Sequence, residues 1–173
     1  MKRTLRKGQF MDIKKELKKY INSYLNIDKD KCFSSGLFSK FNSKESSCLE
    51  DGDIEQYIND NKDDKLFQTL LFRYIDRTKL KDSDIYNRVN MDRRLFSKLR
   101  NLEYHPSKET IILLGLALEL NIDELEDFLK SASYSLPTNN EYDLIIRFCF
   151  INKIYDVIEV NDMLDDYGFK TLN

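Results

Sequence analysis

The sequence predicts an all-α protein, and three features of its composition and patterning support that prediction. Only 5 of its 173 residues are glycine and 2 are proline, too few for the many turns of an all-β fold. Hydrophobic residues make up 41% of the chain and aromatic residues 12%, so there are enough apolar side chains for a folded core. From residue 53 onward, apolar residues recur at the three- and four-residue spacing of helices almost without interruption.

The first helix is expected over residues 12–25, DIKKELKKYINSYL, with Asp12 as its N-cap. One face of this helix is apolar, through Ile13, Leu17, Tyr20, Ile21 and Tyr24. Its opposite face is strongly basic. We interpret the basic face as solvated charge, with contact to phosphate or to an acidic partner as the alternative. Residues 1–27 form this basic amphipathic region.

Residues 28–52 lose the helical spacing and contain six serines, which predicts a Ser-rich linker. Phe33, Phe38 and Phe41 are unusual in a free linker, so we expect them to contact the fold or a partner.

The region 53–133 is predicted to hold a short helix at 53–60 and then five helices joined by short connections. The five are expected at 65–79, 83–89, 92–101, 108–120 and 122–131. Ser107 is expected to cap the fourth, and Asn121 with Glu124 has the spacing of a capping box for the fifth. Asn90, which tolerates the left-handed conformation, lies in the tight joint between the second and third. Two short helices that meet at such a turn are the helix-turn-helix pattern.

The segment 84–125, DIYNRVNMDRRLFSKLRNLEYHPSKETIILLGLALELNIDEL, resembles the lambda-repressor-like (Cro/C1, XRE-type) helix-turn-helix family without a gap. With the preceding helix from Leu66, the resemblance covers about 60 residues. The resemblance rests on two sequence motifs of the family, "PS..TL..LA.AL" and the "gvs.dEL" that ends the pattern. It rests also on the apolar positions of the second and third helices. These matches are Ile85, Val89, Met91, Leu95, Leu99, Pro106, Ser107, Thr110, Ile111, Leu114, Ala117, Leu118, Leu120, Asp123, Glu124 and Leu125.

The resemblance implies a five-helix domain that binds double-stranded DNA, with bases read by the third helix. The segment 83–101 carries five Lys/Arg against two Asp/Glu in a chain of net charge −2, so positive charge is concentrated there. Arginine forks onto guanine, and serine reaches either base edge. By position, we expect DNA contacts from the third helix, from the basic residue near its end and from two residues of the following loop. These residues are Arg93, Arg94, Ser97, Lys98, Arg100, Tyr104 and His105.

Two positions depart from the family pattern. The family often has glutamine at the start of the second helix, where it contacts phosphate, but this chain has Asp82, and a carboxylate repels phosphate. Tyr86 occupies a position where the family usually packs a small alanine against the third helix. The alternative is therefore that the same fold serves packing and protein contacts, with Arg93, Arg94 and Lys98 as a solvated face.

The C-terminal extension, 134–173, is predicted to add two helices within 141–167. Its apolar residues exceed the needs of one exposed helix, which indicates either a homodimer interface or packing against the chain's own first helix: Leu144, Ile145, Phe148, Cys149 and Ile151. Residues 154–173 carry five acidic residues and one lysine, so this segment is expected either away from DNA or in competition with DNA for the basic helix.

The segment from Leu66 to the end is also similar to a helical module that follows a macro domain or another effector in bacterial proteins, through the phrases LFSK.R, YHPSK, YDLII and IYD. Residues 1–52 are too short for a macro domain, so that domain's ligand binding is not implied here. These relatives favour, as an alternative to DNA binding, a protein-protein interaction or adaptor module in a stress or phage-defence system.

No pattern of catalysis is present, so we expect neither an enzyme nor a cofactor or metal site. His105 is the only histidine, and the chain has no Gly-rich phosphate loop and no G-x-S-x-G elbow. Cys32, Cys48 and Cys149 are odd in number and widely spaced, which favours reduced thiols in the cytoplasm. The longest apolar run, 111–118, is far short of the roughly 20 residues of a membrane span. The sequence predicts a cytoplasmic transcription regulator that binds duplex DNA as a homodimer.

Overall fold

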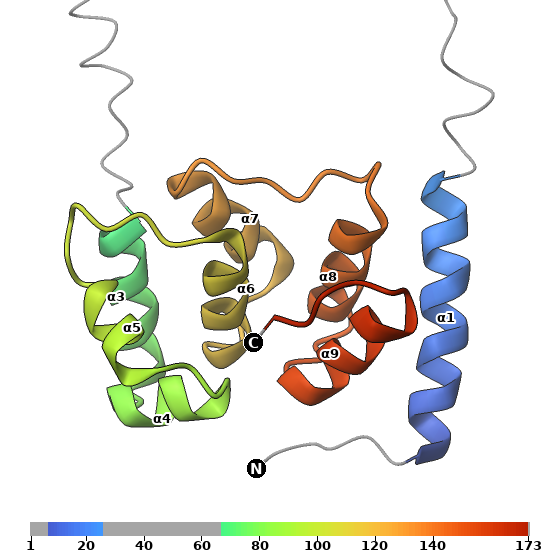
Figure 1. The fold of residues 1–173 in the computed structure, drawn as a ribbon, viewed down its shortest axis with the longest axis horizontal. Coiled ribbons are helices and arrows are strands. Elements are labelled where there is room, and N and C mark those ends of the chain that lie inside the picture. The colour runs from blue at the N-terminus through green and yellow to red at the C-terminus, as the bar shows by residue number, and fades with distance from the viewer. Residues whose placement is uncertain (1–6, 26–66, 173) are drawn as a thin grey trace, which may run out of the picture.

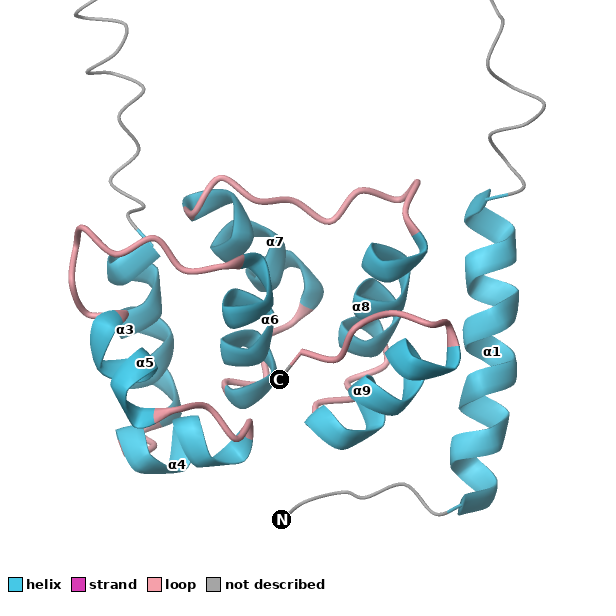
Figure 2. Ribbon diagram, viewed as in Figure 1, coloured by secondary structure: helices cyan, strands magenta, loops and turns pink. Residues whose placement is uncertain are grey.

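A computed structural model describes residues 7–25 and 67–172, with side chains from Asp12 onward. These ranges contain eight helices and no strand (Figure 1, Figure 2), which confirms the all-α prediction for the part of the chain described. The predicted linker at 28–52, the predicted helix at 53–60 and two of the three cysteines lie outside these ranges.

Helix α1 (Lys7–Leu25) begins five residues before Asp12, so the prediction that Asp12 caps this helix is wrong. Asp12 lies inside the helix instead, with Oδ1 at 3.9 Å from Nζ of Lys15 one turn later. The predicted start rests on the apolar periodicity counted from Ile13, whereas the helix itself begins at Lys7.

Five helices follow, close to the predicted positions: α3 (Phe67–Thr78), α4 (Asp82–Arg88), α5 (Arg93–Lys98), α6 (Lys108–Ala117) and α7 (Ile122–Ser131). Several end earlier than predicted. A left-handed residue, Lys79 after α3 and Glu119 after α6, turns the chain away from the helix.

The predicted N-terminal caps of α6 and α7 are confirmed. The Ser107 hydroxyl accepts a hydrogen bond from the Thr110 backbone N–H at 3.2 Å. Asn121 and Glu124 form the reciprocal capping box, with bonds of 2.9 Å and 3.0 Å. Both caps satisfy backbone donors that the first turn of a helix leaves without partners.

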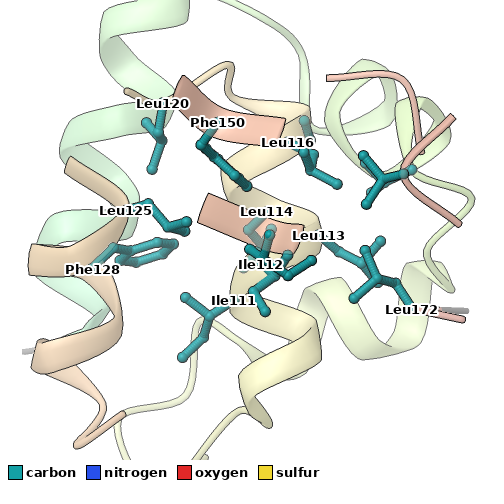
Figure 3. Packing of buried hydrophobic residues seen from close by; sticks show 14 of the residues in the cluster. Ile111, Ile112, Leu113, Leu114, Leu116, Leu120, Leu125, Phe128, Phe150 and Leu172 are labelled. Carbon is teal, nitrogen blue, oxygen red and sulfur yellow. The ribbon is translucent and has the colours of Figure 1, made fainter. Parts of the chain in front are cut away.

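Helix α6 forms the centre of the core, and every residue from Thr110 to Ala117 is buried (Figure 3). Gly115 allows its neighbours to approach closely. A Cβ atom there would lie 2.9 Å from Leu125 of α7 and 3.1 Å from the Phe150 ring of α8 (Glu141–Ile151). These three helices therefore meet at one tightly packed point, and the C-terminal extension shares the core of the preceding five helices.

Two ion pairs and a hydrogen bond fix the extension to the five-helix unit. The Nζ atom of Lys108 lies 2.5 Å from Oδ1 of Asp143, whose side chain is almost fully buried. Arg147 of α8 pairs with Glu126 of α7. After α8, the Tyr155 hydroxyl donates to the Leu120 carbonyl at 2.9 Å, before α9 (Val157–Asp166) closes the fold.

Helix α1 packs on the outer face of α8 (Figure 1). Leu17 and Ile21 are buried there, and the rings of Tyr20 and Phe148 have centroids 5.5 Å apart. Lys14 pairs with Asp166 of α9. Of the two roles considered for the apolar residues of α8, packing against the chain's own first helix is the one observed, although Ile151 remains 48% exposed.

Candidate nucleic-acid interface

The connection between α4 and α5 is a closed turn. Asn90 has φ 52°, the left-handed conformation predicted for it. The Met91 N–H then donates to the Tyr86 carbonyl at 2.8 Å. Val89 and Met91, on either side of Asn90, are both buried. The turn therefore fixes α5 relative to α4 through backbone hydrogen bonds and through the core.

Helix α5 is short and sits on the core by one face. Its N-cap is Asp92, whose carboxylate accepts the Arg94 N–H at 2.5 Å. Phe96 is buried, and the partly buried Tyr86 packs its ring at 5.8 Å from the Phe96 ring. The tyrosine that departs from the family pattern therefore lies half-buried against α5 and leaves the helix in place.

The remaining residues of α5 form an exposed basic surface. Leu99, just after the helix, is fully buried and Leu95 is partly buried, while Ser97 is exposed. Arg93, Arg94 and Lys98 are also exposed, and none of them forms an ion pair within the described ranges. We call these three residues the α5 basic surface.

Arginines elsewhere on the fold are mostly neutralised by carboxylates. The pairs are Arg77 with Glu124, Arg88 with Glu119, and Arg147 with Glu126. The Arg77 guanidinium beside Glu124 holds the pKa of that carboxyl below its ordinary value, mainly through their hydrogen bond. These arginines tie their helices to a second helix or to the turn that follows it, in contrast to those of the α5 basic surface.

Arg100 differs from the cations of α5 with which the sequence groups it. It lies two residues beyond the end of the helix and pairs with Asp82, the first residue of α4. Its guanidinium carbon also lies 5.9 Å from the centroid of the Phe72 ring. In the sequence, Asp82 stands out as a departure from the family pattern, and Arg100 as one of the expected DNA-binding residues. Their pairing could not be predicted from the sequence, because the two positions are 18 residues apart and meet only in the folded chain.

The loop after α5 is attached to the start of α3. The Gln68 side-chain amide donates to the Asn101 carbonyl at 3.0 Å and more weakly to the Tyr104 carbonyl at 3.4 Å. Tyr104 is partly buried and His105 is exposed. Of the two loop residues predicted to contact DNA, only His105 therefore has an exposed side chain.

No group of three or more His, Cys, Asp or Glu side chains in the described part of the chain is arranged to hold a metal ion. None of the helices at 7–25 and 67–172 combines the length and apolar character of a membrane span. Cys149 is fully buried, and burial raises the pKa of its thiol to about 12. Comparison of the chain with models of known families, with curated proteins and with solved structures found no match.

Proposed function

We propose that this protein binds double-stranded DNA through α5, in a helix-turn-helix of the lambda-repressor-like type, and regulates transcription. The observation that carries the proposal is the α5 basic surface. Three cations lie exposed and without ion pairs on a six-residue helix, in a chain whose net charge is −2. Cations without carboxylate partners are available to neutralise phosphates, and their clustering gives a local positive field that the whole chain lacks.

The geometry of α5 also suits base recognition. A single helix fits the major groove of B-DNA, and Arg93 and Arg94 begin the helix, the end that reaches base edges in this type of motif. Ser97 and Lys98 lie about one turn further on, on the exposed side. Phe96 and Leu99 hold the opposite side in the core. An anchored helix with a fixed exposed face provides the rigid register that sequence-specific contact needs.

The order of helices supports the type of motif. Two short helices, α4 and α5, meet at a left-handed turn and lie in the chain between the longer α3 and the longer α6 and α7 (Figure 1). The Ser107 and Asn121 caps occur where the resemblance implies helix starts. Homodimerisation stays a prediction, and a dimer would need a surface other than the face of α8 that packs on α1.

Binding of a protein partner stays the alternative function, with α5 as a solvated face. The two functions differ in how strongly the binding constant depends on salt concentration. Contacts to phosphates release counterions, so the logarithm of the binding constant falls linearly with the logarithm of salt concentration, by about 0.9 per phosphate contact on duplex DNA.

The test is a genomic selection of DNA fragments on the full chain, followed by fluorescence anisotropy on the selected duplex. Arg93→Gln with Arg94→Gln should weaken binding at least about tenfold, because one well-placed arginine contributes about 1–3 kcal/mol of base discrimination. Lys18→Gln with Lys19→Gln is the matched control. It removes two adjacent exposed cations from α1, which lies across the fold from α5 (Figure 1).

The α1 control variant should bind the duplex with an affinity within about threefold of that of the unmodified protein. Its two lysines lie far from α5, so salt largely screens their attraction to the DNA. Equal loss in both variants would mean that binding follows overall charge and does not involve α5. Failure to select any fragment at 50 mM salt would remove the proposal and leave the protein-partner alternative.

A further inference from the structure

We propose, resting on the DNA-binding function above, that Asp82 withholds Arg100 from DNA. In this view Asp82 acts as an internal substitute for a phosphate. Its carboxylate occupies the guanidinium of Arg100 and so limits the attraction of the protein to DNA of any sequence. The phosphodiester backbone is the ligand that competes for the same guanidinium.

The position of the pair supports this role. Arg100 follows Lys98 of the α5 basic surface by two residues, so a duplex that lies along α5 passes beside it. Asp82 reaches the same place from the start of α4. The side chains of Asp82 and Arg100 are 43% and 49% exposed, so both are open to an approaching polyanion. The pair therefore lies at the rim of the proposed interface and is not buried beneath it.

The guanidinium is held from two directions. Asp82 hydrogen-bonds to it, and the ring of Phe72, which is 38% exposed, lies 5.9 Å from its central carbon. A cation near an aromatic face gains from the ring quadrupole, so this contact adds to the ion pair. For Arg100 to reach a phosphate, it would have to leave both contacts.

Its departure would also leave a carboxylate unpaired beside the DNA backbone. A second carboxylate, that of Asp84, is exposed in the first turn of α4 together with Asp82. Two carboxylates near a phosphate repel it, and Arg100 masks one of them while it remains paired. The arrangement therefore favours retention of the Asp82–Arg100 pair when DNA is bound, and Arg100 contributes no phosphate contact in the unmodified protein.

A double-variant cycle on the full chain tests the proposal, with binding to a labelled random duplex and to the selected duplex measured from 50 to 300 mM salt. Asp82→Asn should free Arg100 and add one phosphate contact. The salt slope should then become steeper by about 0.9, and affinity for both duplexes should rise about fivefold at 0.15 M salt. Arg100→Gln alone leaves the Asp82 carboxylate unmasked, so its slope should be no steeper than that of the unmodified protein. The combined variant should return to the slope of the unmodified protein.

Asp162→Asn is the matched control, because it removes one exposed carboxylate from α9 and changes the net charge equally. Its slope should stay that of the unmodified protein. If Asp82→Asn lowers the thermal midpoint of the helical signal, Asp82→Ser repeats the measurement with a residue that also suits a helix start.

The outcomes separate the two proposals. Absence of DNA binding by the unmodified protein and by every variant removes the proposed function and this inference with it. If the unmodified protein binds, an unchanged slope in Asp82→Asn overturns the inference alone. A slope that becomes steeper in Arg100→Gln, or one that stays steep in the combined variant, also overturns it, because the added phosphate contact would then not come from Arg100.

Discussion

Helices α5 and α8 both carry arginine, but they use charge in opposite ways. In α8, the two charged residues that face the fold are paired across helix boundaries, Asp143 with Lys108 and Arg147 with Glu126. In α5, Arg93, Arg94 and Lys98 point to solvent with no carboxylate partner in the described ranges. The two helices also differ in burial, since seven of the eleven residues of α8 are buried but only one of the six in α5.

This difference indicates which charges stabilise the fold and which are available to a ligand. A buried charge is costly unless it is paired and hydrogen-bonded, so α8 could be placed in the core only with its partners present. An exposed arginine contributes little to stability whether paired or not. The charges of α5 are therefore free to serve binding at small cost to the fold, and those of α8 are not.

The largest expected effect comes from the core side of this comparison. Phe150→Ala should lower the free energy of unfolding by about 3–5 kcal/mol, because the ring fills the space between α6 and α7 and its removal leaves a cavity. Urea denaturation followed by circular dichroism measures the change. Ile158→Ala, at a position 71% exposed, is the control and should stay within about 0.5 kcal/mol. A loss below about 1 kcal/mol for Phe150→Ala would show that α8 is not part of the shared core.

The next effect concerns the buried pair. Asp143→Ala should cost about 2–4 kcal/mol, since it leaves the Lys108 ammonium, whose side chain is only 21% exposed, without its counter-charge. The combined change Lys108→Met with Asp143→Leu should recover most of that loss, because two apolar side chains of similar volume carry no charge to desolvate. Thermal and urea unfolding of the three proteins measure the difference. Equal losses in the single and combined variants would assign the cost to packing and not to charge.

The sequence predicted the features of this fold that depend on near neighbours. The Ser107 cap, the Asn121–Glu124 box and the left-handed Asn90 each involve residues within three positions of one another, so local chemistry decides them. The Asp12 cap failed although it is also local. The start was predicted from apolar spacing counted from Ile13, but the helix begins six residues earlier, at Lys7. An apolar stripe read from the sequence thus did not locate the start of this helix.

Features that depend on tertiary placement could not be predicted. The sequence did not decide whether the apolar residues of α8 form a dimer interface or pack against α1. Tyr20 and Phe148 are more than a hundred residues apart, and they come into contact only in the folded chain. The same holds for the candidate interface. Arg93, Arg94 and Lys98 are exposed as their helical positions indicate, but Arg100 is paired by a residue from another helix. Sequence spacing identifies the cations, and packing decides which of them are unpaired.

The smallest expected effect is the change in stability when the α5 basic surface loses charge. Arg93→Gln with Arg94→Gln should alter the free energy of unfolding by no more than about 0.5 kcal/mol, because both side chains are exposed and neither takes part in an ion pair. Glutamine also keeps the helix propensity close to that of arginine. Urea denaturation in the buffer of the DNA-binding test measures this directly. A loss of 2 kcal/mol or more, on the order of a core substitution, would mean that these arginines support the fold. Any weakening of DNA binding in this variant would then report partial unfolding, and the contrast between α5 and α8 would no longer hold.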